Sequence, residues 1–147
     1  LWGSADMLLT EEKSLCGKRQ AIVVSKDARQ SREHRAINPD RSFDLRHYKL
    51  DGDIVQNEKS CDFLLLNDSL KKAYFIELKG KNINDAVDQL EASTNRFATE
   101  LQGYMFFYRI VCSKALTHKI RDPKYRKFQE KYGSKLITRE YIEEKLE

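Results

Sequence analysis

The chain has 147 residues, 40% of them hydrophobic, and a formal net charge of +4 at pH 7. This length predicts a single domain over residues 7–147, and we expect no membrane-spanning helix because no run of about 18 apolar residues occurs. Residues 1–6, LWGSAD, resemble the remnant of an expression tag and are set apart from the domain. Three widely spaced cysteines without a CxxC pair, Cys16, Cys61 and Cys112, predict reduced thiols in a cytoplasmic protein.

Charge is distributed unevenly along the chain. Residues 17–49 include nine basic and four acidic residues, and residues 114–135 include eight and two. Residues 50–113, between these segments, include seven basic and ten acidic residues. An acidic centre between basic segments fits a protein that binds a polyanion and holds cations at its centre, and solvated surface is the alternative interpretation.

The first third of the chain predicts little regular structure. A short helix is expected within residues 8–20, with Thr10 as its N-cap. Residues 25–42 are polar and rich in arginine, and they predict a loop. Alternation of polar and apolar residues over 43–50 predicts a strand that ends in an Asp-Gly turn.

The centre of the chain predicts two strands, a helix and a third strand. The apolar runs 61–66 and 72–79 predict neighbouring strands, and the short link between them requires an antiparallel pair. A helix is expected to start at Asn82 or Asn84, because apolar residues then recur every three or four positions. Residues 104–111 predict a strand, and the helix before it allows a crossover to a parallel partner.

The last part of the chain predicts a basic helix over 123–132, a short strand over 135–137 and a terminal helix over 140–146. The expected fold is therefore α/β. It has a central mixed β-sheet, built from an antiparallel meander and a crossover strand, and flanked by helices.

Two acidic residues lie in apolar runs that are expected to be buried strands, Asp62 in CDFLLL and Glu77 in YFIELK. Side chains alternate across a strand, so Glu77 and Lys79 share one face. A register that brings Asp62 near Glu77 gathers two carboxylates and one ammonium at a sheet edge. Such carboxylates repel each other, and a divalent cation relieves the repulsion. Two carboxylates, a main-chain carbonyl and water suit Mg²⁺, with Mn²⁺ as the alternative.

The succession CDFLLL, FIELKG and AVDQLE resembles the PD-(D/E)xK nuclease superfamily, which has the restriction-endonuclease-like fold. The resemblance covers residues 61–91 closely and the element order of 43–111 loosely. It implies that Asp62, Glu77 and the main-chain carbonyl of Leu78 bind the metal ion, and that Lys79 acts on the attacking water. In the same way, it implies that Gln89 orients the lysine or the water.

Each part of this motif also has an ordinary structural interpretation. E-x-K is common on solvated strand faces, an isolated Asp62 is a typical turn-capping residue, and a Gln fits a solvated helix face. The superfamily often has a further Glu on an early helix. Glu33 is the first candidate for this catalytic position, followed by Glu11 or Glu12 and by Asp51 near a strand end.

Basic residues outside the motif are candidates for contacts with the phosphate backbone of a nucleic acid. They are Arg29, Arg32, Arg35, Lys119, Arg121, Lys124, Arg126, Lys127 and Lys131. In the helix expected over 123–132, aromatic residues also recur at helical spacing. This helix is expected to pack through its aromatic stripe, with its basic face either solvated or laid along a phosphate backbone.

The predicted function is a metal-dependent nuclease that hydrolyses the phosphodiesters of nucleic acid, DNA rather than RNA, with Mg²⁺ or Mn²⁺ as the cofactor. Small relatives such as archaeal Holliday-junction resolvases work as dimers, so the resemblance implies a homodimer. A partner protein that supplies specificity is the alternative. Two other functions stay open: a catalytically silent nuclease-like module that binds nucleic acid or protein, and a subunit active only in a larger repair or defence assembly.

Overall fold

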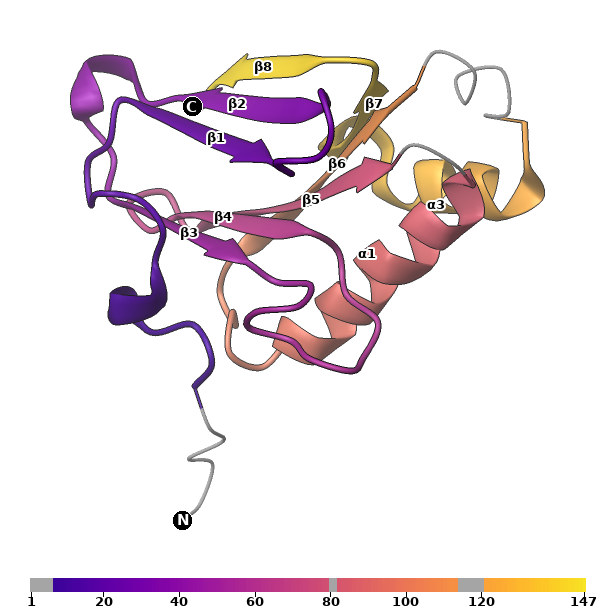
Figure 1. The fold of residues 1–147 in the computed structure, drawn as a ribbon, viewed down its shortest axis with the longest axis horizontal. Coiled ribbons are helices and arrows are strands. Elements are labelled where there is room, and N and C mark those ends of the chain that lie inside the picture. Colours follow the sequence, from indigo (N-terminus) through magenta and orange to yellow (C-terminus); the bar gives the residue numbers. More distant parts are fainter. Residues whose placement is uncertain (1–6, 80–81, 114–120) are drawn as a thin grey trace.

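The structure, a computed structural model, describes residues 7–79, 82–113 and 121–147, with the exception of the side chain of Lys79. The predicted tag remnant, residues 1–6, and the candidate Lys119 lie outside this part of the chain. The described residues form two mixed β-sheets and two α-helices (Figure 1), which confirms the α/β class. No helix among them is long and apolar enough to cross a membrane.

The larger sheet, within the described residues, has five strands in the order β3-β4-β5-β6-β7. Their bounds are β3 (Leu45–Lys49), β4 (Phe63–Asn67), β5 (Lys72–Lys79), β6 (Met105–Cys112) and β7 (Leu136–Arg139). β3, β4 and β5 are antiparallel neighbours, whereas β6 lies parallel to both β5 and β7. The predicted meander and crossover strand are confirmed, because a short hairpin link joins β4 to β5 and a helix separates β5 from β6.

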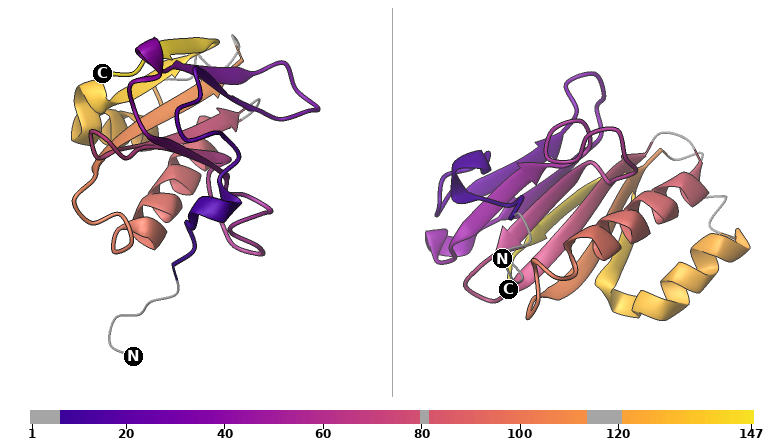
Figure 2. Two further views of the ribbon diagram at one scale, coloured as in Figure 1. Left: turned by 90° about the vertical axis from the view of Figure 1, so that its left-hand side faces the viewer. Right: turned by 90° about the horizontal axis from the view of Figure 1, so that it is seen from below.

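Helices α1 (Ile83–Phe97) and α3 (Pro123–Tyr132) cover one face of this sheet (Figure 2). Asn82 caps α1, as predicted, because its side-chain oxygen accepts hydrogen bonds from the N–H groups of Asn84 and Asp85. The apolar stripe of α1 and the aromatic stripe of α3 are buried against the sheet. This cluster includes Leu64, Leu66, Phe75, Ala86, Leu90, Phe97, Tyr108, Tyr125 and Phe128.

A second sheet covers the opposite face (Figures 1 and 2). Its strands are β1 (Ile22–Lys26), β2 (Glu33–Ile37) and β8 (Ile142–Lys145). β1 and β2 form an antiparallel hairpin, and β8 runs parallel to β2. The apolar side chains between the two sheets include Val23, Ala36, Leu65, Ile76, Leu78 and Ile142. The two described helices therefore lie on one face of the larger sheet, and the second sheet covers the other face.

The sequence misses this second sheet in two places. A loop is predicted over 25–42, but β2 forms within it. The sequence does not reveal this strand, because its inward positions hold the polar His34 and the small Ala36. A helix is predicted over 140–146, where β8 forms instead. Ile142 and Leu146 have a helical spacing, yet both are buried between the sheets. Pairing with a distant strand, rather than local pattern, decides the structure of these segments.

The N-terminal segment is extended, and the predicted helix within residues 8–20 is wrong. Only Glu11–Lys13 forms a single 3-10 turn, and the side chain of Thr10 makes no capping hydrogen bond. The segment is held from outside, because the carboxylate of Glu100 accepts hydrogen bonds from the N–H groups of Leu8 and Leu9 at 3.0 and 2.8 Å. A contact with a distant part of the chain therefore outweighs the local helix signal.

A charged group is buried between the two sheets. The Glu144 carboxylate accepts hydrogen bonds from Arg109 at 2.7 and 3.0 Å and lies 2.6 Å from His34 Nε2. Burial acts to raise the pKa of Glu144, but the hydrogen bonds from His34 and Arg109 hold it at about 2. Next to this group, Ser25 Oγ lies 2.9 Å from His47 Nε2, and burial lowers the pKa of His47 to about 4. Together these polar contacts fix the second sheet on the first.

Candidate functional site

The register of the β4–β5 hairpin brings Asp62 and Glu77 together. Phe63 pairs with Ile76, so the next position puts Asp62, directly before β4, opposite Glu77. The Asp62 N–H donates to Glu77 Oε1 at 3.0 Å, and the Leu78 N–H donates to Asp62 Oδ2 at 2.8 Å. Each carboxylate is therefore fixed by the main chain of the segment that carries the other.

The surroundings of these carboxylates disfavour negative charge. Glu77 is only 2% exposed, and Asp62 is half-buried. Burial raises the pKa of Asp62 above its ordinary value, and the charge of Asp51 adds to this rise. The Leu78 N–H, the charge of Lys49 and the contact with Glu77 oppose the rise without cancelling it. A pair of poorly solvated carboxylates of this kind is stabilised by a bound cation.

The next two residues of the motif complete the end of β5. Leu78 is buried, and its main chain borders the Asp62 carboxylate through the hydrogen bond from its N–H. Lys79 is the last residue of β5 and pairs with Cys112 of β6. The side chain of Lys79 lies outside the part that the structure describes. The roles of the Leu78 carbonyl and of Lys79 stay predictions.

Helix α1 carries Gln89 on the side that meets the sheet. Gln89 is half-buried and lies one turn before Ser93, which is buried. Ser93 Oγ accepts a hydrogen bond from the Cys61 N–H at 2.9 Å and lies 3.2 Å from Ser60 Oγ. This face of α1 therefore borders the start of β4, next to Asp62, and Gln89 lies on it.

Among the candidates for a further acid, the structure brings Asp51 to the pair. The Leu50 N–H donates to the Asp62 carbonyl at 2.8 Å, and Asp51 is the next residue. Glu33 lies on the outward face of β2, where it forms ion pairs with Lys26 at 4.0 Å and Arg35 at 3.4 Å. The structure does not bring Glu33 to the carboxylate pair, and Asp51 replaces it as the candidate.

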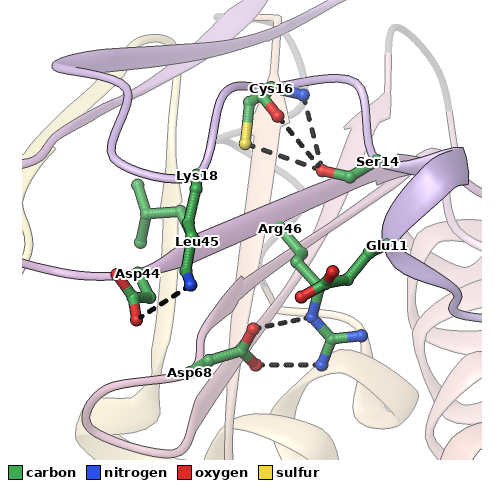
Figure 3. Close-up of a pocket in the computed structure, with 8 residues that line it drawn as sticks. All are labelled: Glu11, Ser14, Cys16, Lys18, Asp44, Leu45, Arg46 and Asp68. Carbon is green, nitrogen blue, oxygen red and sulfur yellow. Dashed lines mark hydrogen bonds and ion pairs between the residues drawn. The ribbon is translucent and has the colours of Figure 1, made fainter.

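A cavity of about 310 Å³ lies at the other end of β4 (Figure 3). Its lining residues are Glu11, Ser14, Cys16, Lys18, Asp44, Leu45, Arg46 and Asp68. Arg46 donates to both carboxylate oxygens of Asp68, at 2.6 and 2.9 Å, and to the Leu9 carbonyl at 2.7 Å. Burial raises the pKa of Cys16, so its thiol stays protonated and is a poor nucleophile. The cavity therefore lies where the N-terminal segment is hydrogen-bonded to the larger sheet.

The position of this cavity also bears on two of the predicted acids. Asp68 follows Asp62 by six residues of nearly continuous strand, about 20 Å at 3.3 Å per residue. Glu11 lines the cavity, and Glu12 is in the same 3-10 turn. The structure therefore places both glutamates at the end of β4 away from the carboxylate pair.

The basic residues predicted to bind nucleic acid fall into separate groups. Arg29 and Arg32 lie in the loop between β1 and β2. Arg35 is occupied by Glu33 at 3.4 Å and Glu143 at 3.3 Å. The described basic residues in and before α3 are all exposed: Arg121, Lys124, Arg126, Lys127 and Lys131.

Helix α3 packs through its aromatic stripe, as predicted. Its buried Tyr125 and Phe128 pack against the sheet cluster, while its basic residues face outward. Lys124, Lys127 and Lys131 line a groove of about 170 Å³ between α1 and α3. Lys124 is partly neutralised there, because its Nζ lies 2.6 Å from Asp88 Oδ1.

Lys49 is the residue near the carboxylate pair that the sequence does not reveal. Its Nζ lies 5.2 Å from the centre of the Phe63 ring, and its charge opposes the rise in the pKa of Asp62. On β3 it follows Leu45 and His47 on the face that is turned toward the second sheet. The sequence does contain one signal, a lysine at a strand position that is expected to face inward. Its role can be inferred only once the segment that packs over this position is known.

No family model, no curated protein and no solved structure matches the chain. Over residues 7–79, 82–113 and 121–147, no group of three or more His, Cys, Asp or Glu side chains is arranged to hold a metal ion. The closest arrangement to the predicted one is the Asp62–Glu77 pair with Asp51 beside it. The function has to be inferred from this geometry.

Proposed function

We propose that the chain is a metal-dependent nuclease that hydrolyses phosphodiester bonds of nucleic acid, DNA rather than RNA, at the Asp62–Glu77 pair. The observation that carries the proposal is the pairing of these two carboxylates across β4 and β5. Their mutual anchoring, Asp62 N–H to Glu77 Oε1 at 3.0 Å and Leu78 N–H to Asp62 Oδ2 at 2.8 Å, holds two poorly solvated carboxyl groups side by side. An arrangement that costs free energy in this way is typical of a functional site.

The donor set fits Mg²⁺ or Mn²⁺. Carboxylate oxygens are the ligands that these hard cations prefer, and burial that raises the pKa of Asp62 is relieved by a positive charge. Asp62, Glu77 and the carbonyl of Leu78 hold the ion in this proposal, with Asp51 as the further acid. When bound, such an ion supplies an acidified water and neutralises charge on the phosphate.

The other residues of the motif act on the water and the phosphate. Lys79 takes the proton of the attacking water or stabilises the charge that develops on the phosphate. Gln89, on the face of α1 that borders β4, orients the lysine or the water. Both roles follow from the resemblance to the PD-(D/E)xK superfamily.

The fold supports the same proposal. An antiparallel meander, a crossover helix and a parallel strand follow one another in β3, β4, β5, α1 and β6. This is the element order that the restriction-endonuclease-like fold implies around its E-x-K strand. The departure is the second sheet, which occupies the face where a helical layer is expected. A homodimer or a partner protein remains part of the proposal as a source of specificity.

A second candidate is a catalytically silent module that binds nucleic acid, alone or in a larger assembly. The observation that favours it is the lack, in the described part of the chain, of three His, Cys, Asp or Glu side chains arranged around one ion. The two candidates differ in whether the Asp62–Glu77 pair is needed for turnover.

A cleavage panel separates these functions. Linear duplex, single strand, four-way junction and RNA are incubated with Mg²⁺, Mn²⁺ or EDTA, for the wild type and for Glu77→Gln. The glutamine keeps an acceptor for the Asp62 N–H and removes one charge, so the fold is expected to persist. Metal-dependent cleavage by the wild type alone supports the nuclease. Undiminished cleavage by Glu77→Gln refutes the site, and binding without cleavage by either protein favours the silent module.

A further inference from the structure

The loop between β1 and β2, residues 27–32, lies at the sheet edge that carries the carboxylate pair. Both views in Figure 2 show this loop on the same side of the molecule as the end of β5. Burial raises the pKa of Cys112, the last residue of β6, and the charge of Arg32 in this loop opposes that rise. Cys112 pairs with Lys79, the last residue of β5.

Lys49 lies beside the start of β4, because it pairs with Phe63 and the next residue, Leu50, donates its N–H to the Asp62 carbonyl at 2.8 Å. The Arg29 N–H, which donates to Asp27 Oδ1 at 2.9 Å, contributes most to the lowered pKa of Asp27, and the charge of Lys49 adds to it. The same lysine opposes the raised pKa of Asp62. Lys49 is therefore adjacent to the edge that carries the carboxylate pair, with its Nζ 5.2 Å from the ring centre of Phe63.

Arg29 is presented outward at the tip of this loop. Asp27 forms the turn, because it accepts the Arg29 N–H with its side chain and the Gln30 N–H with its carbonyl at 3.0 Å. The Arg29 side chain is 91% exposed, and its ion pair with Asp27, at 3.7 Å, is therefore weak. Its guanidinium is available to a phosphate, unlike that of Arg35, which is held by Glu33 and Glu143.

We propose that Lys49 and Arg29 form a phosphate-binding wall beside Asp62 and Glu77, on the side of the larger sheet away from α1. The wall binds the nucleic-acid backbone next to the phosphate that is cut. This inference rests on the proposed function and adds to it the path of the substrate strand. The path passes between the β1–β2 loop and the carboxylate edge.

The electrostatics of the edge require such a wall. Asp51, Asp62 and Glu77 repel a phosphodiester, which carries one negative charge per nucleotide. Lys49 is adjacent to this acidic group, and Arg29 extends the positive charge along the loop. Arginine and lysine are the side chains that most often contact phosphates, and such contacts fix the register of the bound strand.

Binding without metal tests the wall independently of cleavage. The dissociation constant of a short fluorescein-labelled DNA duplex, and of its single strand, is measured by anisotropy in EDTA at several salt concentrations. Each phosphate contact contributes about 0.9 to the slope of log K against log salt, so its loss weakens duplex binding about fivefold at 0.15 M salt. Arg29→Gln and Lys49→Gln are each expected to lower the affinity by about this factor and to reduce the slope by about 0.9.

The matched control is Arg41→Gln. Arg41 is exposed in the 3-10 turn Pro39–Arg41, which follows β2 at the end opposite the loop. This variant removes the same charge at a position remote from the wall, so its affinity for the probes and its salt slope are expected to stay near those of the wild type.

The outcomes separate the wall from the proposed function. Losses in Arg29→Gln and Lys49→Gln but not in Arg41→Gln support the wall. Equal losses in all three variants, unchanged binding in Arg29→Gln, or no binding of either probe by the wild type overturns it. The expected losses together with no metal-dependent cleavage leave the wall supported and refute the nuclease.

Discussion

The half-buried Glu144 is expected to contribute a pH-dependent part of the stability of this fold. Its side chain accepts hydrogen bonds from Arg109 at 2.7 and 3.0 Å and lies 2.6 Å from His34 Nε2. These partners hold its pKa at about 2 in the folded state, against 4.5 for the free side chain. Because the folded-state pKa is the lower one, the contribution is complete above about pH 5 and is lost as the pH falls toward 2.

The size of this contribution follows from the shift. At 1.36 kcal/mol per pKa unit, the ionised carboxylate stabilises the folded state by about 3 kcal/mol at pH 7 and about 1 kcal/mol at pH 3. Glu144→Gln removes this term and leaves Arg109, whose side chain is 5% exposed, without its anionic partner. The variant is therefore expected to lose at least about 3 kcal/mol at pH 7, and at least about 1 kcal/mol at pH 3.

Urea unfolding of the wild type and Glu144→Gln between pH 3 and pH 7 measures both values. Glu143→Gln is the matched control, because Glu143 is the neighbouring residue of β8 and faces solvent, 3.3 Å from Arg35. An exposed pair of this kind contributes less than about 1 kcal/mol. A loss below about 1 kcal/mol in Glu144→Gln at pH 7, or an equal loss at pH 7 and pH 3, contradicts the role of this carboxylate.

Three further predictions concern single residues. Asp62→Asn keeps an acceptor for the Leu78 N–H and removes a carboxylate whose pKa is raised by burial, so that its ionisation opposes folding. At pH 7 without metal, the variant is therefore expected to unfold at a higher urea concentration than the wild type, and at pH 3 it is expected to gain nothing. A lower unfolding midpoint at pH 7 contradicts this. The His47 ring is expected to titrate near pH 4 by NMR, and a midpoint near the ordinary 6.5 contradicts its burial against the second sheet. Ser93→Ala leaves the buried Cys61 N–H without its acceptor and is expected to cost about 1–3 kcal/mol in urea unfolding, whereas an unchanged midpoint shows that α1 does not hold the start of β4 in this way.

Local pattern predicts the elements around the carboxylate pair. The link between β4 and β5 is too short for any connection but a hairpin, but the register also depends on the geometry of the turn. The structure supplies this register, in which Phe63 pairs with Ile76 and Asp62 comes opposite Glu77. The cap at Asn82 and the crossover from β5 to β6 follow from equally local signals.

The second sheet is not predictable in this way, because its strands are specified by partners far along the chain. His34 occupies an inward position of β2 only because Glu144 and Arg109 surround it there. Glu144 in turn lies on β8, which pairs with β2 across more than 100 residues of sequence. Sequence pattern alone assigns charged residues of this kind to the surface, so it does not predict that they face inward.

The same cause hides part of the candidate site. Lys49 gains its place only when it pairs with Phe63, and Asp51 only when Leu50 pairs with Asp62. Glu33 is the opposite case, because the sequence offers it as a candidate, but the side of the sheet to which it points is known only once β2 forms.

The central claim is that Asp62 and Glu77 together bind a divalent cation, and titration calorimetry with Mn²⁺ tests it most directly. The proteins are the wild type, Asp62→Asn, Glu77→Gln and the control Asp40→Asn, whose carboxylate lies in the remote turn after β2. Saturable binding by the wild type and Asp40→Asn, lost in both site variants, is the predicted result. Equal binding by all four proteins, or no binding by the wild type, contradicts the account.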